Sequence, residues 1–230
     1  MVGRRKYDDG CAVAHALDLV GERWALLVVR ELLLGPKRFT DLLSGLPGAS
    51  PDVLTQRLRE LAEVGVVRRR RLAPPAASWV YELTSWGAEL EPIVLRLARW
   101  GSRSPGMRYD APLGVDSLVL SLMALFDGTA AAGFEATVGL RLGADEFRLV
   151  VADGRLAVSR GEAGSPGTAG QPEAVLDTDV ATLLTLLRTD RPLADAVEAG
   201  TLRLTGDPAV ADRLRRLFPA PEPVPVEQRT

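Results

Sequence analysis

The stretch that decides the fold of the first half of the chain is SPDVLTQRLRELAEVGVVRRRR, residues 50–71. Ser50 stands where a helix N-cap is expected, and Pro51 follows at the first helical position. Three leucines repeat at the spacing of one buried helix face: Leu54, Leu58 and Leu61. Gly65 ends the helix, and the apolar and basic run after it is typical of a strand. The stretch therefore predicts an amphipathic helix followed by an arginine-rich strand.

The helix face opposite these leucines is polar. At about 100° per residue, Arg59, Asp52 and Gln56 lie roughly opposite Leu54, and Thr55 and Arg57 lie on the two flanks. Side chains of these types read base edges in DNA. The predicted DNA-binding residues of the helix are Ser50, Asp52, Thr55, Gln56, Arg57 and Arg59. A solvated face on a core helix has the same composition, so the helix alone does not decide between the two interpretations.

The flanking segments favour DNA binding. RFTDLLSGL, residues 38–46, predicts a preceding helix, and WVYEL, residues 79–83, predicts a second strand after the turn signals of APPAAS. Two helices followed by a basic hairpin is the order of a winged helix-turn-helix domain. Four arginines on such a hairpin are expected to contact phosphate: Arg68, Arg69, Arg70 and Arg71.

A long helix is predicted after the hairpin, from SWGAELEPIVLRLARWG at residues 85–101, with a kink at Pro92. Its apolar stripe consists of Leu90, Ile93, Val94 and Leu97. The helix is a candidate dimerisation element, although plain core packing would give the same periodicity.

Charge is unevenly distributed along the 230 residues. Residues 1–110 carry 17 Lys and Arg against 13 Asp and Glu, a net charge of +4, and residues 111–230 carry 11 against 17, a net charge of −6. This asymmetry predicts two domains with different partners. No apolar run is long enough for a membrane span, the N-terminal residues do not resemble a signal peptide, and one cysteine cannot form an internal disulfide. We therefore expect a cytoplasmic protein.

The second half alternates strand and helix signals. FRLVVADGRLAVSR, residues 147–160, predicts a hairpin whose tight turn is Asp153-Gly154. AVLDTDVATLLTLLR, residues 174–188, predicts a strand running into a helix that is capped near Asp177 or Thr178. A flexible loop is expected at residues 160–173.

Residues 7–101 resemble the HxlR-type bacterial winged-helix regulators. GERWALLVVRELLLGPKRF, SPDVLTQRLRELAEVGVV and YELTSWG carry the resemblance. It implies a homodimeric transcriptional regulator that binds double-stranded DNA, with the recognition helix at Ser50–Val64 and the wing at Val66–Leu83. Cys11 matches a cysteine that senses oxidants or electrophiles in some members; otherwise it is a small buried apolar residue.

Residues 113–219 resemble the sterol-carrier-protein-like fold, most clearly in LDTDVATLLTLLRTDRPLADAVEAGTLRLTGDPAVADRLRRLF. The resemblance implies an α/β sheet with helices that enclose an apolar cavity for a lipid or another apolar effector. The candidate lining residues, which would serve equally well as core, are Phe126, Phe134, Val138, Leu183, Leu186 and Leu187.

The chain has one histidine, His15, and one cysteine, so neither a metal site nor a serine triad is predicted, and we expect no cofactor and no enzyme activity. The predicted fold class is α+β. The expected parts are a winged helix-turn-helix domain at 1–101, a linker at 102–112, a sterol-carrier-like α/β domain at 113–219 and a Pro-rich tail at 220–230. A lipid carrier with only non-specific DNA affinity is the alternative function.

Overall fold

The computed structural model describes residues 6–74, 77–161, 170–189 and 191–225. Parts of four predicted segments lie outside these residues: the N-terminal end, the tip of the wing, most of the loop at 160–173 and the end of the Pro-rich tail. The chain forms two compact units, residues 1–94 and 95–230. No helix among the described residues is both long and apolar enough to cross a membrane.

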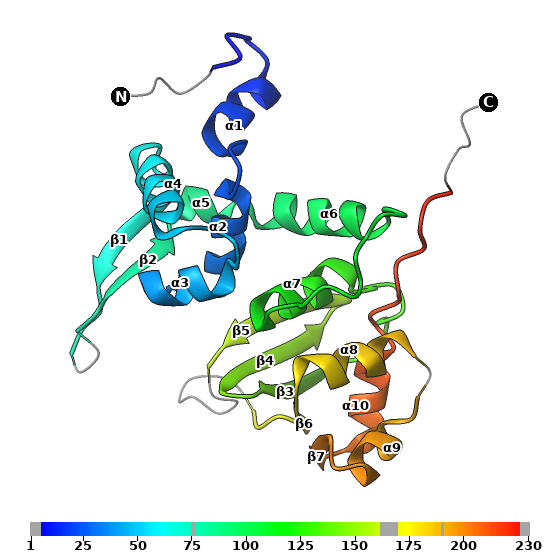
Figure 1. Ribbon diagram of the computed structural model, residues 1–230. Coiled ribbons are helices and arrows are strands. Elements are labelled where there is room, and N and C mark those ends of the chain that lie inside the picture. Colours follow the sequence, from blue (N-terminus) through cyan, green and yellow to red (C-terminus); the bar gives the residue numbers. More distant parts are fainter. Residues whose placement is uncertain (1–5, 75–76, 162–169, 190, 226–230) are drawn as a thin grey trace. The chain divides into compact units, whose positions relative to one another are not determined.

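The first unit contains helices and one small sheet (Figure 1). Its elements are α1 (Ala12–Val20), α2 (Ala25–Leu32), α3 (Phe39–Gly45), α4 (Pro51–Glu63), β1 (Val67–Arg71), β2 (Trp79–Leu83), α5 (Ser85–Ala88) and the start of α6 (Glu91–Ser102). The strands β1 and β2 pair antiparallel. The core is made by apolar side chains of α2, α3, α4 and β1, which the amphipathic spacing of these segments predicts.

The long helix predicted after the wing is two helices. Thr84 caps α5, because its hydroxyl accepts a hydrogen bond from the Gly87 amide at 3.0 Å. Residues 89–90 interrupt the helix, and Pro92 is the second residue of α6. The disruption predicted at Pro92 takes the form of a break rather than a kink. The first helix ends at Ala88, four residues before Pro92, and the proline lies in the first turn of α6, where its missing amide has no intrahelical acceptor to lose.

The second unit is a five-stranded sheet covered by helices. Its elements are α7 (Val115–Leu125), β3 (Ala136–Leu142), β4 (Asp145–Ala152), β5 (Arg155–Arg160), β6 (Ala174–Thr178), α8 (Val180–Arg188), α9 (Leu193–Glu198), β7 (Leu202–Gly206) and α10 (Pro208–Arg215). The strand order is β5-β4-β3-β6-β7, with β3 and β6 parallel and the other pairs antiparallel. Helices α7, α8 and α10 lie over one face of this sheet (Figure 1).

Local signals account for two features of the second unit. The hairpin of β4 and β5 turns at Asp153 and Gly154, whose φ angles of 51° and 66° are those of a tight hairpin turn, as predicted. The cap of α8 is Asp179 rather than Asp177 or Thr178, because the Asp179 carboxylate accepts from the Thr182 amide at 2.8 Å. Asp177 instead faces Arg203 on β7 at 3.7 Å.

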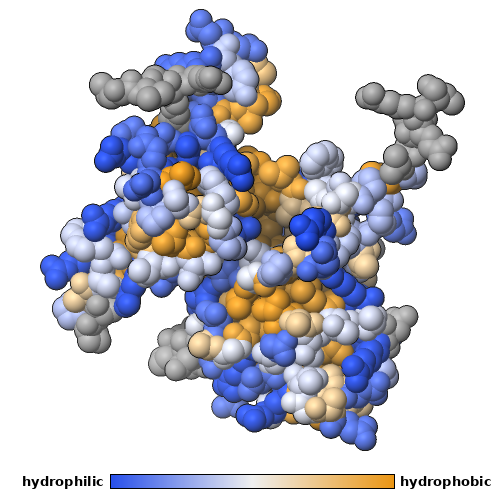
Figure 2. All heavy atoms as spheres, viewed as in Figure 1, coloured by the Kyte–Doolittle hydropathy of each residue, from blue (hydrophilic) through white to orange (hydrophobic). Residues whose placement is uncertain are grey.

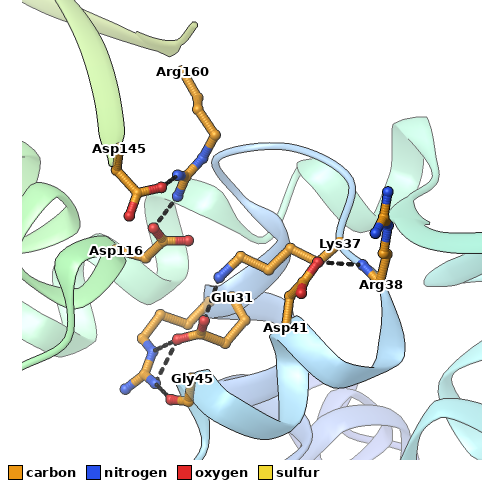
Figure 3. Close-up of polar contacts among 9 residues, drawn as sticks. Glu31, Lys37, Arg38, Asp41, Gly45, Asp116, Asp145 and Arg160 are labelled. Atoms are coloured by element: carbon orange, nitrogen blue, oxygen red, sulfur yellow. Dashed lines mark hydrogen bonds and ion pairs between the residues drawn. The ribbon is translucent and has the colours of Figure 1, made fainter. Parts of the chain in front are cut away.

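A buried ion cluster holds α7 against the edge of the sheet. Asp116 on α7 is 6% exposed and pairs with Arg160 on β5, which also pairs with Asp145 on β4 (Figure 3). The Arg160 guanidinium lies 4.7 Å from the centre of the Phe147 ring. Because breaking a buried ion pair leaves a charge without compensation, this cluster fixes the position of α7 on the sheet.

Candidate nucleic-acid interface

Helix α4 has the cap and the buried face that its sequence predicts. The Ser50 hydroxyl accepts a hydrogen bond from the Val53 amide at 3.3 Å, and Pro51 is the first helical residue. The three leucines at 54, 58 and 61 are at most 2% exposed. Their burial fixes the rotation of the helix, so the polar face must point to solvent.

The exposed face of α4 presents four of the predicted residues. Asp52, Thr55, Gln56 and Arg59 are exposed. The Thr55 hydroxyl donates to the Pro51 carbonyl at 2.8 Å, and the Gln56 amide donates to Glu60 at 2.7 Å. Arg59 makes no hydrogen bond or ion pair within the described part of the chain. Its guanidinium is therefore an available positive group on this face.

Arg57 does not belong to the exposed face, which corrects the sequence prediction. Its side chain is 14% exposed and pairs with Glu60, and its guanidinium lies 3.8 Å from Glu22 on the segment before α2. The flank position calculated from the helical period is right, but the neighbouring segment covers that flank. Arg57 therefore contributes to the packing of α4 rather than to its accessible charge.

The four arginines of the wing divide between two faces of the hairpin. Successive side chains of a strand alternate, and the antiparallel register sets Arg68 opposite Glu82 and Arg70 opposite Val80. Arg68 Nε donates to Glu82 Oε1 at 2.8 Å, and Arg70 Nε donates to Glu82 Oε2 at 2.6 Å. One carboxylate thus holds two guanidinium groups, each of which keeps its terminal nitrogens for another acceptor.

Glu82 is an organising residue that sequence reasoning missed. Its side chain is 12% exposed, whereas those of Arg68 and Arg70 are 65% and 43% exposed. Burial by itself raises the pKa of Glu82, but the hydrogen bonds and positive charges of Arg70 and Arg68 outweigh it and hold this pKa below its ordinary value. The signal lay in the cross-strand pairing, which becomes visible only once the hairpin register is known.

The other face of the wing carries Arg69 and Arg71. The Arg69 guanidinium lies 4.6 Å from the centre of the Trp79 ring and 5.9 Å from that of Tyr81, so it stacks on an aromatic surface. Trp79 itself is 51% exposed. Arg71 Nε donates to the Ala77 carbonyl at 3.2 Å. Within the described residues neither arginine pairs with a carboxylate, so their positive charge is not compensated locally.

A second buried carboxylate fixes the wing on the helices. Lys37 and Tyr81 exchange backbone hydrogen bonds of 3.0 and 2.8 Å, which adds a one-residue third strand to the wing. The Lys37 ammonium bonds to Glu31 of α2, which is 2% exposed and also accepts from Arg30 at 2.8 Å (Figure 3). A Cβ at Gly45 would lie 2.1 Å from Glu31 Oε2, so any larger residue there would displace this carboxylate.

Cys11 is exposed and is the N-cap residue of α1. The backbone amides of Ala14 and Val13, in the first turn of α1, hold the pKa of the Cys11 thiol below its ordinary value. Its exposure shows that Cys11 is not a small buried core residue.

The predicted ligand-lining residues of the second unit do not enclose a cavity between sheet and helices. Val138 and Leu183 face a void of only about 20 Å³, and Leu186 is 1% exposed in the core. Phe126 packs on Phe218 with ring centres 6.0 Å apart. Phe134 lies 5.5 Å beneath the Arg213 guanidinium. Side chains of the sheet and helices leave little space between these residues, so their contact with a ligand stays a prediction.

Leu187 alone among them lines a larger cavity, of about 440 Å³, and none of the described residues in its wall belongs to a strand. Its wall comes from α7, α8, the segment that follows α6 and the C-terminal segment at residues 218–223. Figure 2 shows apolar side chains gathered over α7 and α8. The predicted linker at 102–112 is therefore part of the second unit, where the Tyr109 carbonyl accepts a hydrogen bond from Arg188 of α8 at 3.3 Å.

The C-terminal segment forms the rest of this wall. The Val224 amide donates to the Arg103 carbonyl at 2.9 Å, and Arg103 Nε donates to the Glu222 carbonyl at 3.2 Å. The described part of the predicted tail is thus extended and held to the segment after α6. Groups of three or more residues able to hold a metal ion are absent from the described residues.

Comparison with known proteins identifies the first unit. The family model of HxlR-like helix-turn-helix proteins matches residues 19–107. An uncharacterized HTH-type transcriptional regulator of Synechocystis, sll1512, is 37% identical over 92 residues, which cover 40% of this chain and 68% of that protein. The Bacillus subtilis regulator YdeP is 35% identical over 97 residues, which cover 41% of this chain and 74% of that protein.

A solved structure is also similar to this part of the chain. The redox regulator HypR in its oxidized form is 34% identical, with a TM-score of 0.38, and the match covers 42% of this chain and 100% of that chain. The likeness of residues 113–219 to sterol-carrier proteins stays a prediction. The family model matches this part of the chain, and the two relatives are matched over most of their own length. The chain therefore belongs to the HxlR-like helix-turn-helix family of transcriptional regulators.

Proposed function

We propose that the protein binds operator DNA as a homodimer through α4 and the wing, and that an apolar small molecule in the second unit alters this binding. The observation that carries the DNA-binding part is the combination, in one compact unit, of an exposed polar face on α4 with uncompensated arginines on the adjacent wing. Affinity would come largely from phosphate contacts and sequence discrimination from the helix.

Each group has a separate task in this proposal. Arg59 and Gln56 contact base edges in the major groove, since an arginine suits guanine and a glutamine suits adenine. The three residues Ser50, Asp52 and Thr55 are exposed at the N-terminal end of α4 and add further contacts to DNA. Arg69 and Arg71 contact backbone phosphate, and the terminal nitrogens of the two arginines held by Glu82 add further donors.

Exposed apolar residues on two helices support a homodimer. On α6, Ile93, Leu97 and Trp100 are 55%, 47% and 76% exposed, and on α1 Val13 and Leu17 are 67% and 42% exposed. These side chains follow helical spacing, so each helix carries an apolar stripe that a second copy would cover. Dimers of this kind read two half-sites about 34 Å apart, one turn of DNA.

The effector part of the proposal is supported by the cavity on α7 and α8, whose volume of about 440 Å³ lies within the usual range for small-molecule sites. Ser102, the last residue of α6, is part of its wall. Because α6 begins in the first unit, a ligand that moves this wall has a continuous helix through which to act.

The experiment that tests the proposal is footprinting of the purified protein on DNA flanking its own gene, at physiological salt, with and without a cellular lipid extract. We expect protection of a pseudo-palindrome with two half-sites, which the extract changes. Protection that ignores the extract would refute the effector part alone. Only non-specific affinity for this DNA and for a random-sequence DNA pool would instead favour the lipid carrier.

We propose thiol sensing as a second role, resting on the exposure of Cys11 and the lowered pKa of its thiol. Iodoacetamide should alkylate Cys11 at a rate whose pH midpoint lies below that of the same thiol in urea-unfolded protein, because unfolding removes the two amide donors. Mass spectrometry measures both rates cleanly, since the chain has one cysteine. Equal midpoints in the folded and unfolded protein would contradict the sensing role.

A further inference from the structure

The wall of the cavity on α7 and α8 consists mostly of apolar residues, and the charged residues in it are basic. Apolar side chains and prolines make up most of it, including Leu118, Leu122, Leu184 and Phe218. Among the described residues that line it, the only charged ones are two arginines, Arg108 and Arg188, and none is Asp or Glu. A ligand with a positive headgroup would find no counter-charge there.

Arg188 is the better placed of the two arginines. It is the last residue of α8, and its guanidinium lies 4.7 Å from the centre of the Tyr109 ring. Its Nη1 donates to the Tyr109 carbonyl at 3.3 Å. The stack and this hydrogen bond hold the group at the wall of the cavity, and within the residues that the structure describes it pairs with no carboxylate. Four of its five N–H donors have no partner there.

Arg108 is less available for a ligand. Its Nη2 pairs with Asp110 at 3.0 Å, and both side chains are about three-quarters exposed. The remaining polar groups of the wall are also occupied or neutral. The Ser121 hydroxyl donates to the Ser117 carbonyl at 2.7 Å, and the Ser102 carbonyl accepts from Tyr109. The site therefore offers one oriented cationic group beside an apolar hollow.

We propose that this cavity binds a small amphiphile with an apolar body and a single anionic headgroup. The body lies between α7, α8 and the C-terminal segment, and the headgroup accepts hydrogen bonds from Arg188. This deepens the effector part of the proposed function, because it names the chemical class of the effector. Charge-assisted hydrogen bonds to a guanidinium are among the stronger contacts in proteins, and the stack on Tyr109 reduces the entropy lost in making them.

Calorimetric titration of the full-length protein with three twelve-carbon ligands tests the proposal: dodecanoate, dodecan-1-ol and dodecyltrimethylammonium, each below its aggregation concentration. Dodecanoate should bind at least about tenfold more tightly than the alcohol, and the ammonium should bind most weakly. Equal affinities for the three headgroups, or binding of none of them, would overturn it. Binding of none is also the result expected if a second copy of the chain occupies the cavity.

Three variants locate the site. Arg188→Gln should lower the affinity for dodecanoate to that for the alcohol and leave the affinity for the alcohol unchanged. The control variant Arg155→Gln, which replaces an exposed arginine on β5, should bind all three ligands as the wild type does. Ser121→Phe should block all three ligands by filling the cavity. If Arg188→Gln keeps the preference for the anion, the headgroup assignment is wrong. These titrations contain no DNA, so a negative result would not contradict the DNA-binding proposal. In the same way, a protein that fails to bind operator DNA could still bind dodecanoate as proposed here.

Discussion

At the scale of single residues, Glu82 decides how much of the positive charge on the wing is compensated. It holds Arg68 and Arg70 at 2.8 and 2.6 Å, while Arg69 and Arg71 on the opposite face pair with no carboxylate among the described residues. An Arg-Arg-Arg-Arg sequence on an isolated strand would carry four equivalent charges. In the hairpin, two of the arginines share the single negative charge of Glu82, and the other two have no carboxylate partner among the described residues.

Replacing this carboxylate should lower stability in a pH-dependent way. We expect Glu82→Gln to cost about 1 kcal/mol of unfolding free energy at neutral pH, because the exposure of both arginines weakens each pair. The folded pKa of Glu82 lies below its ordinary value of 4.5, so the contribution is present above that value and lost as the pH falls through the folded pKa. Urea titrations of both proteins between pH 7 and pH 3 measure the difference. A difference that grows toward low pH would contradict this account.

The two arginines of α4 provide a matched pair. Arg59 is exposed without a partner in the described chain, whereas Arg57 is paired with Glu60 and covered. Arg59→Ala should weaken binding to the cognate site by about 1–3 kcal/mol and relax its preference over random DNA. Arg57→Ala should leave that preference unchanged. Fluorescence anisotropy on both DNAs measures the ratio; the same loss of preference in the two variants would mean that α4 does not read bases through Arg59.

At the scale of elements, the wing should act through counterion release. Each phosphate contact contributes about 0.9 to the slope of log affinity against log salt, so the double variant Arg69→Ala, Arg71→Ala should flatten that slope by up to about 2. The double variant Arg155→Ala, Arg203→Ala removes the same charge from β5 and β7 of the second unit. It should leave the slope at the wild-type value. Equal slopes in the wing variant and wild type would defeat the wing assignment.

The elements with local signals are the ones that sequence could predict. Ser50-Pro51 predicts the start of α4, and Asp153-Gly154 predicts the hairpin of β4 and β5, because each signal acts on its own neighbours. The pairing of Arg57 with Glu22 and the division of the wing arginines depend on neighbours distant in sequence. The packed interior beneath α8 escaped prediction for another reason: an amphipathic helix has the same periodicity whether it covers a core or a cavity.

At the scale of the whole molecule, the distribution of charge matches a division of tasks. Residues 1–110 have a net charge of +4 and residues 111–230 a net charge of −6, so the second part of the chain repels phosphate while the first attracts it. A protein with this distribution gains little DNA affinity from residues 111–230. We therefore expect any influence of these residues on DNA binding to pass through the chain that joins them to the first part, and not through contacts of their own with DNA.

That influence is subject to linkage. If an anionic amphiphile changes the affinity for the operator by some factor, the operator must change the affinity for the amphiphile by the same factor. We expect a factor between about 5 and 150, the usual range for coupled sites. Titrating dodecanoate into the protein with and without saturating operator DNA, and operator into the protein with and without dodecanoate, gives two independent values. If the two coupling factors agree and exceed unity, the protein is a sensor. If both factors equal unity although both ligands bind, the second unit binds its ligand without affecting DNA binding.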